Sequence, residues 1–161
     1  MAYVTPGTVA AGDVATAAAW NVLVGNDVAF SPLLDAWTNW TPTLTQTGAV
    51  TKTINSATFI QIGKLVFAEF NLVVTGSGAG LTGVTVSLPV TAKSKTGVRI
   101  GVGSIFDNST TTQYAAVCYQ ISTTTVGFIG DWSAGAQWGS SPAINLAVSD
   151  NVAASLTYEA A

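Results

Sequence analysis

The sequence has no histidine, one cysteine and very few charged residues. It contains five Lys and Arg and eight Asp and Glu in 161 residues, so 8% of the chain is charged, against about 25% in an average soluble domain. Without histidine, the Ser-His and Cys-His pairs of many hydrolases cannot form, and one cysteine cannot complete the ligand set of a zinc site. We therefore expect a protein that is not an enzyme and that uses no cofactor and no metal.

Long apolar runs and clustered positive charge are also missing. No run of about 18 apolar residues occurs, so no membrane-spanning helix is predicted, and the first residues lack the features of a secretory signal. A net charge of −3 leaves no basic stripe for nucleic acid. We expect neither a membrane nor a nucleic acid as a partner. Cys118 lies among apolar residues and is predicted to be buried.

Apolar residues are abundant despite this lack of charge. They make up 48% of the chain. Monomers rarely expose large contiguous apolar patches, so contacts between subunits would cover such a surface. We therefore expect an obligate homo-oligomer.

The character of the chain changes at Trp37. Residues 1–36 are predicted to form an N-terminal anchor and linker, and residues 37–161 a β-sandwich domain. In the first segment, Thr16 is a candidate N-cap for a short helix over residues 17–24. Trp20, Leu23 and Val24 would form the apolar side of this helix. Because so short a helix is unstable alone in water, it would either pack on its own domain or dock on a partner surface.

The rest of the chain has the composition of short β-strands separated by turns. The strand predicted over residues 64–75 carries Val66, Phe70 and Val74 on one face and Leu65 and Phe67 on the other. Apolar residues on both faces predict burial on both sides, inside a sandwich or against a neighbouring subunit. The other predicted strands cover residues 41–47, 50–55, 57–62, 84–88, 97–106, 113–120, 124–131, 143–148 and 152–158. This spacing indicates an all-β fold, a sandwich or jelly roll.

The tryptophans are the main candidates for a binding site. Trp132 and Trp138, with Gln137 beside them, form a candidate ligand loop that would stack on sugar rings and orient them through an amide. The same rings would also serve to pack the end of a sandwich or a subunit seam, and we favour this packing interpretation. Trp37 and Trp40, before the first predicted strand, are expected to anchor the linker on the sheets.

Two acidic residues lie in turn-forming clusters. Asp107 precedes Asn108, Ser109 and Thr110, and Asp150 lies between Ser149 and Asn151. Such residues form turns through side-chain hydrogen bonds to the backbone. We interpret both as turn residues in preference to calcium ligands.

Several motifs between residues 12 and 89 carry a resemblance to a known class of protein. They are W-T-P-T-L-T at residues 40–45, A-T-F-I-Q-I-G-K-L-V at residues 57–66 and V-T-V-S-L-P at residues 84–89. These motifs resemble the knob domains of bacteriophage fibre and minor tail proteins. Residues 12–21 resemble the short helical element that precedes such knobs in phages of actinobacteria. Beyond residue 89 the resemblance is one of strand pattern alone.

The resemblance implies a virion structural protein, with three chains forming a homotrimer of β-sandwich knobs. Because a long fibre would need more shaft than residues 1–36, the preferred version is a capsid decoration or head-fibre protein. Trp20, Leu23 and Val24 would then anchor the knob to the major capsid protein, or to a tail protein of the same virion. The alternative is a tail-fibre, tail-tip or baseplate protein that recognises a host cell-surface glycan. In both versions the chain is expected in the virion, assembled in the host cytoplasm.

Overall fold

The computed structural model describes residue 16 and residues 20–22, 37–130 and 136–161. The chain divides into two units, Met1–Ala36 and Trp37–Ala161. In the first unit, residues 20–22 are helical and the Trp20 N–H donates to the Thr16 carbonyl at 3.0 Å. The rest of the expected helix, residues 17–19 together with Leu23 and Val24, lies outside the described residues.

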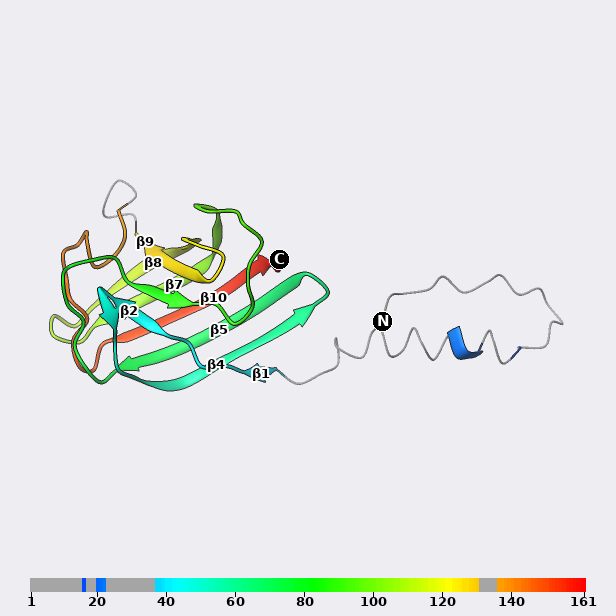
Figure 1. Ribbon diagram of the computed structural model, residues 1–161. Coiled ribbons are helices and arrows are strands. Elements are labelled where there is room, and N and C mark those ends of the chain that lie inside the picture. The colour runs from blue at the N-terminus through cyan, green and yellow to red at the C-terminus, as the bar shows by residue number, and fades with distance from the viewer. Residues whose placement is uncertain (1–15, 17–19, 23–36, 131–135) are drawn as a thin grey trace. The chain divides into compact units, whose positions relative to one another are not determined.

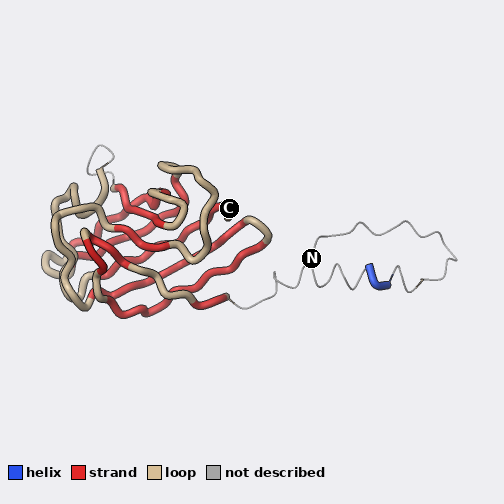
Figure 2. The backbone as a smooth tube through the Cα atoms, in the orientation of Figure 1, coloured by secondary structure: helices blue, strands red, loops and turns tan. Residues whose placement is uncertain are grey.

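The described residues of the second unit contain ten strands, which form one sheet (Figure 1). Strands dominate this unit, with loops at their ends (Figure 2). Along the sheet the order is β1-β4-β5-β10-β7-β8-β9-β6-β2-β3, and every neighbouring pair is antiparallel. The strands are β1 (Thr38–Asn39), β2 (Leu44–Gln46), β3 (Gly48–Ala49), β4 (Lys52–Ile62), β5 (Leu65–Val74), β6 (Thr85–Ser87), β7 (Arg99–Asp107), β8 (Thr112–Gln120), β9 (Thr125–Ile129) and β10 (Asn151–Glu159). The prediction of an all-β fold is confirmed.

The alternation of apolar and polar residues explains why the central strands form. In β5, burial alternates along the whole strand, with Val66, Phe70 and Val74 turned into the core as predicted. In β10, Val152 and Leu156 are buried in the same alternating way. A two-residue turn joins β4 to β5. Gly63 supplies the positive φ of 59° that this turn needs, because a glycine adopts the left-handed region without steric cost.

The sheet is curled so that its two ends approach each other. In a flat sheet, β1 and β2 would lie about 38 Å apart at about 4.8 Å per strand. Yet residues 40–43, which join them, span at most about 18 Å when fully extended. Residues 50 and 51 likewise join β3, at one end of the sheet, to β4, which lies next to the other end. The curl therefore follows from chain connectivity.

The core lies inside this curl. The ring of Phe70 on β5 contacts Trp40 at a centroid distance of 6.2 Å and Phe128 on β9 at 6.5 Å, both edge to face. Phe128 is fully buried, whereas Trp40 is half-buried. Trp40 thus anchors the chain before β2, as expected. Trp37 is 48% exposed, so the expectation that it also anchors the linker is wrong for its side chain.

The predicted strand over residues 143–148 is not a strand. The buried side chain of Gln46 on β2 takes the place of a neighbouring strand for this segment. Its amide nitrogen donates to the Ile144 carbonyl at 2.8 Å, and its amide oxygen accepts from the Leu146 N–H at 2.8 Å. One side chain therefore satisfies two backbone groups. The apolar pattern of residues 143–148 reflects burial of Leu146 and not pairing in the sheet.

Candidate interaction surface

The side of the sheet that faces away from the core is open along its central strands. We call this surface the outer face. It consists of the outward side chains of β4, β5, β10, β7 and β8, arranged in rows by the strand register. One row is Thr58, Glu69, Ser155, Val102 and Val117, and the next is Ser56, Asn71, Ala153, Ser104 and Ala115.

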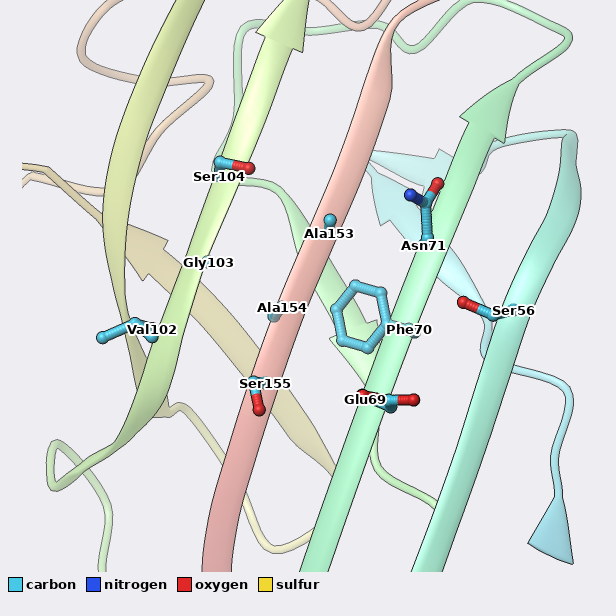
Figure 3. A pocket seen from close by; sticks show the side chains of 10 residues that line it. All are labelled: Ser56, Glu69, Phe70, Asn71, Val102, Gly103, Ser104, Ala153, Ala154 and Ser155. Carbon is cyan, nitrogen blue, oxygen red and sulfur yellow. The ribbon is translucent and has the colours of Figure 1, made fainter. Parts of the chain in front are cut away.

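A shallow depression of about 400 Å³ lies in the middle of the outer face. In Figure 3, Ala153 and Ser155 on β10 form its centre, with Ser104 on β7 and Asn71 on β5 on either side. Its floor is low because the central side chains are small. On the core side of β7, a Cβ on Gly103 would lie 2.6 Å from the Ala153 carbonyl oxygen, so glycine allows β7 and β10 to lie close together here.

Apolar side chains project from the outer face, Val102 at the depression and Leu65 and Phe67 nearer the start of β5. Val102 is 65% exposed, Leu65 42% and Phe67 36%. The two-sided apolar pattern of β5 predicts burial of both faces, but within one chain Leu65 and Phe67 remain open to solvent. The outer face is therefore a sheet surface that the described residues leave uncovered. Transfer of exposed apolar surface out of water is favourable, so this face is suited to contact.

The outer face carries two charged groups that make no ion pair within the described residues, Glu69 on β5 and Arg99 on β7. The register places both on this face, because Glu69 pairs with Ser155 and Arg99 pairs with the outward Tyr119. The Glu69 carboxylate accepts one hydrogen bond from the Thr58 hydroxyl at 3.3 Å. The polar groups available on this face are therefore hydroxyls, amides, one carboxylate and one guanidinium.

A third charged group at the end of β10 is already neutralised. Glu159 accepts from Lys93 at 2.7 Å and from Lys95 at 2.8 Å. These hydrogen bonds and charges lower the pKa of Glu159 to about 2. Lys93 and Lys95 are thus engaged within the chain and do not form a free basic patch.

The predicted turn residues Asp107 and Asp150 are buried structural groups. The Asp107 carboxylate accepts from the Ser109 hydroxyl at 2.6 Å and from the Ser109 N–H at 2.9 Å. The Asp150 carboxylate accepts from the N–H groups of Asn108 and Ala147 at 2.9 and 2.7 Å. Together the two carboxylates hold the β7–β8 turn against the segment before β10. The prediction that both are turn residues is confirmed.

The predicted ligand loop does not present the expected pair of rings. Trp138 is fully buried and packs edge to face on Tyr114 at a centroid distance of 5.9 Å, so its ring has no free face for a sugar. Gln137 donates its amide to the Val84 carbonyl at 2.9 Å and acts as a structural bridge. Trp132 lies outside the described residues. The packing interpretation therefore applies to Trp138 and Gln137, and the sugar-stacking role assigned to Trp138 is wrong.

The predicted anchor is described only in part. Trp20 is 62% exposed, while Leu23 and Val24 fall outside the described residues. Sequence reasoning missed Val102, Glu69 and Arg99 as surface residues of one face. The available signal was the apolar second face of the strand over residues 64–75, which indicates an uncovered side of the sheet.

The described residues contain no group of three or more Cys, Asp or Glu side chains placed to hold a metal ion. No helix in the described part of the chain is long and apolar enough to cross a membrane.

No family model matches the chain, and neither a curated protein nor a solved structure shows significant similarity to it.

Proposed function

We propose that the chain is a structural protein of a bacteriophage virion, a homotrimeric surface knob that decorates or reinforces the capsid. The observation that carries this proposal is the outer face, which leaves Val102, Leu65 and Phe67 open on a chain with 8% charged residues. Burial of such a surface stabilises an assembly by about 25 cal/mol per Å² of apolar area. A protein of this kind acts through contact with other surfaces.

The motifs that resemble phage knobs are also the residues that build this fold. Trp40 of the first motif packs on Phe70, and residues 57–66 form the β4–β5 hairpin. The third motif contains β6, whose Val86 is fully buried. The motifs that carry the resemblance therefore include residues that form the core and the strands. The contact between Phe70 and Phe128 supports a jelly-roll-like sandwich, in which two parts of the curled sheet face each other.

Particle composition tests the proposal. Particles are banded from a lysate of cells that carry the gene, their peptides are identified by mass spectrometry, and the chain is located in a cryo-electron microscopy map. We expect the chain in the band, in groups of three on the capsid surface. Recovery of the chain only outside particles would contradict the proposal.

A matched pair of exposed tryptophans tests the proposed anchor. Trp20→Ala should abolish incorporation into particles, because Trp20 is the described part of the anchor and is 62% exposed. Trp37→Ala changes another exposed tryptophan and should leave incorporation intact. Equal loss in both variants would show that the anchor is assigned to the wrong residues.

The alternative function is that of a tail protein that binds a host cell-surface glycan. The burial of Trp138 removes one of the two rings proposed to stack on sugar. A glycan would instead have to use the hydroxyls and amides of the outer face, such as Ser56, Asn71 and Ser104. Saturable binding to host cells, together with tail density in the map, would favour this alternative over capsid decoration.

A further inference from the structure

We infer that the outer face is the seam between copies of this chain, so that neighbouring copies cover Val102, Phe67 and the depression. This inference rests on the proposed function, because it names the surface through which the knob would assemble. It is carried by the size of the face, by its charges and by its shape.

The size of the outer face matches what a stable protein contact needs. Its five strands, β4, β5, β10, β7 and β8, are each nine to eleven residues long. At about 4.8 Å between strands and about 3.3 Å per residue, they cover about 700 Å². A standard interface buries about 800 Å² on each partner. Coverage of this face by neighbouring copies would therefore bury, on each copy, an area close to that of a specific complex.

The charges of the outer face complement each other between two copies. Within the described residues neither Glu69 nor Arg99 makes an ion pair, and the register separates them by β10. A second copy brings one more charge of each sign to the same face. Glu69 can then meet Arg99 of the partner subunit, while Glu159 is already satisfied by its two lysines. Opposite charges at an interface fix its register and disfavour other partners.

The shape of the face is also self-complementary. Val102 projects from β7, and beside it Ala153 leaves the depression of about 400 Å³. An aliphatic side chain of the partner fits such a hollow, as side chains interdigitate when sheets pack face to face. The face therefore carries both a projection and a hollow. Around a three-fold axis the projection of one copy would enter the hollow of the next, which is the head-to-tail contact that closes a ring.

Two valines of similar exposure provide the first test. Val102 on the outer face is 65% exposed, and Val148, which lies outside that face, is 56% exposed. The mass in solution is measured by light scattering after size-exclusion chromatography, for the full chain at micromolar concentration. Wild-type protein and Val148→Arg should have the mass of several chains, and Val102→Arg the mass of one. A monomeric wild type, or equal masses for the two variants, would overturn the inference.

An exchange of the two charges provides a second test, in which a double variant should regain the self-association that each single variant weakens. Glu69→Arg and Arg99→Glu each place like charges across the seam, and each should raise the dissociation constant at least about tenfold. The double variant restores opposite charges, so it should recover most of the wild-type affinity. A variant that merely misfolds would not be rescued in this way. If the double variant is no better than the two single variants, Glu69 and Arg99 do not meet across copies and the proposed seam is wrong.

These tests fail separately from those of the proposed function. If the chain is present in particles but is monomeric in solution and insensitive to Val102→Arg, the proposed virion function stands and the inferred contact between copies is wrong. If the chain assembles through the outer face but is missing from particles, the inferred contact between copies stands and the proposed virion function is wrong. Binding of a glycan or another protein to a monomeric wild type would assign the face to that partner and overturn the inference.

Discussion

The rings of Phe70 and Phe128 lie edge to face, with centroids 6.5 Å apart and planes at 87°, although three strands separate β5 from β9 in the sheet. This contact is possible only because the sheet curls around the core. Trp40 extends the cluster through a second edge-to-face contact with Phe70. Edge-to-face pairs of this kind add about 0.5–1.5 kcal/mol beyond the burial of their area.

Truncation of Phe128 should therefore weaken the fold strongly. Phe128→Ala removes a fully buried ring and leaves a cavity at the centre of the curl. We expect a loss of about 3–5 kcal/mol in the free energy of unfolding, measured by denaturant titration. Val148→Ala, which truncates an exposed side chain, should change this free energy by less than about 0.5 kcal/mol. Similar losses in the two variants would mean that the core does not lie between β5 and β9.

Gln46 should be as important as an apolar core residue. Gln46→Leu keeps the volume of the side chain but leaves the Leu146 N–H and the Ile144 carbonyl without their partner. Because each buried unsatisfied group costs about 1–3 kcal/mol, we expect a loss of about 2–4 kcal/mol in the free energy of unfolding. Gln61 is exposed and donates to the Gly63 carbonyl at 2.8 Å, so Gln61→Leu is the matched control and should have little effect.

Acid should destabilise the fold through Asp107. Burial raises the pKa of its carboxyl, but hydrogen bonds from Ser109 and Thr110 outweigh burial and hold the pKa below its ordinary value. A lowered pKa in the folded state stabilises the protein above the ordinary carboxyl pKa of about 3.9, and this stabilisation is lost as the pH falls through the folded pKa. The free energy of unfolding should therefore fall on acidification.

Two variants isolate this contribution. Asp107→Asn should lose about 1–2 kcal/mol at neutral pH and show a flatter dependence of stability on pH, because it cannot ionise. Ser109→Ala keeps the carboxylate but removes the hydroxyl donor at 2.6 Å. Its acid transition should begin at a higher pH than that of the wild type. Identical pH profiles for the wild type and Asp107→Asn would contradict this account.

The thiol of Cys118 should be unreactive in the folded protein. It is fully buried on β8, and burial raises the pKa of its thiol to about 12. Since the thiolate is the reactive form, an aromatic disulfide reagent should modify Cys118 only when the chain unfolds. Val148→Cys adds an exposed thiol that should react at once in the folded state. Rapid modification of the wild-type protein would show that the outer and core sides of β8 are wrongly assigned.

The sequence allows the strands and their buried sides to be predicted, but not how the strands meet. Alternation in residues 64–75 correctly identifies Val66, Phe70 and Val74 as core residues. The break predicted between residues 55 and 57 coincides with a β-bulge inside one strand, β4, between Ile54 and Ser56. Periodicity reports which side of a strand is buried within a short window. A bulge shifts that period by one residue and so resembles the end of a strand.

The candidate surface was harder to predict because it depends on pairing over long distances. Val102, Ser155 and Glu69 form one row only through the register of β7, β10 and β5. Nothing in their local sequence distinguishes them from other outward residues. The role of Trp138 was left between two interpretations for a related reason, since an aromatic residue beside a loop of small residues is suited both to a binding site and to a core. Burial of Trp138 depends on Tyr114, which lies 24 positions earlier in the chain.

The bulge in β4 also interrupts an edge of the sheet that is only partly paired. β1 pairs with only Thr58 and Phe59 of β4, so much of the backbone edge of that long strand is unpaired by β1. Lys52 begins this edge, and the irregularity between Ile54 and Ser56 interrupts it. Charged residues and bulges at such an edge prevent a foreign strand from adding to it, as happens in amyloid. In a chain that is rich in β-structure and poor in charge, this irregular edge therefore disfavours the pairing of a further strand with β4.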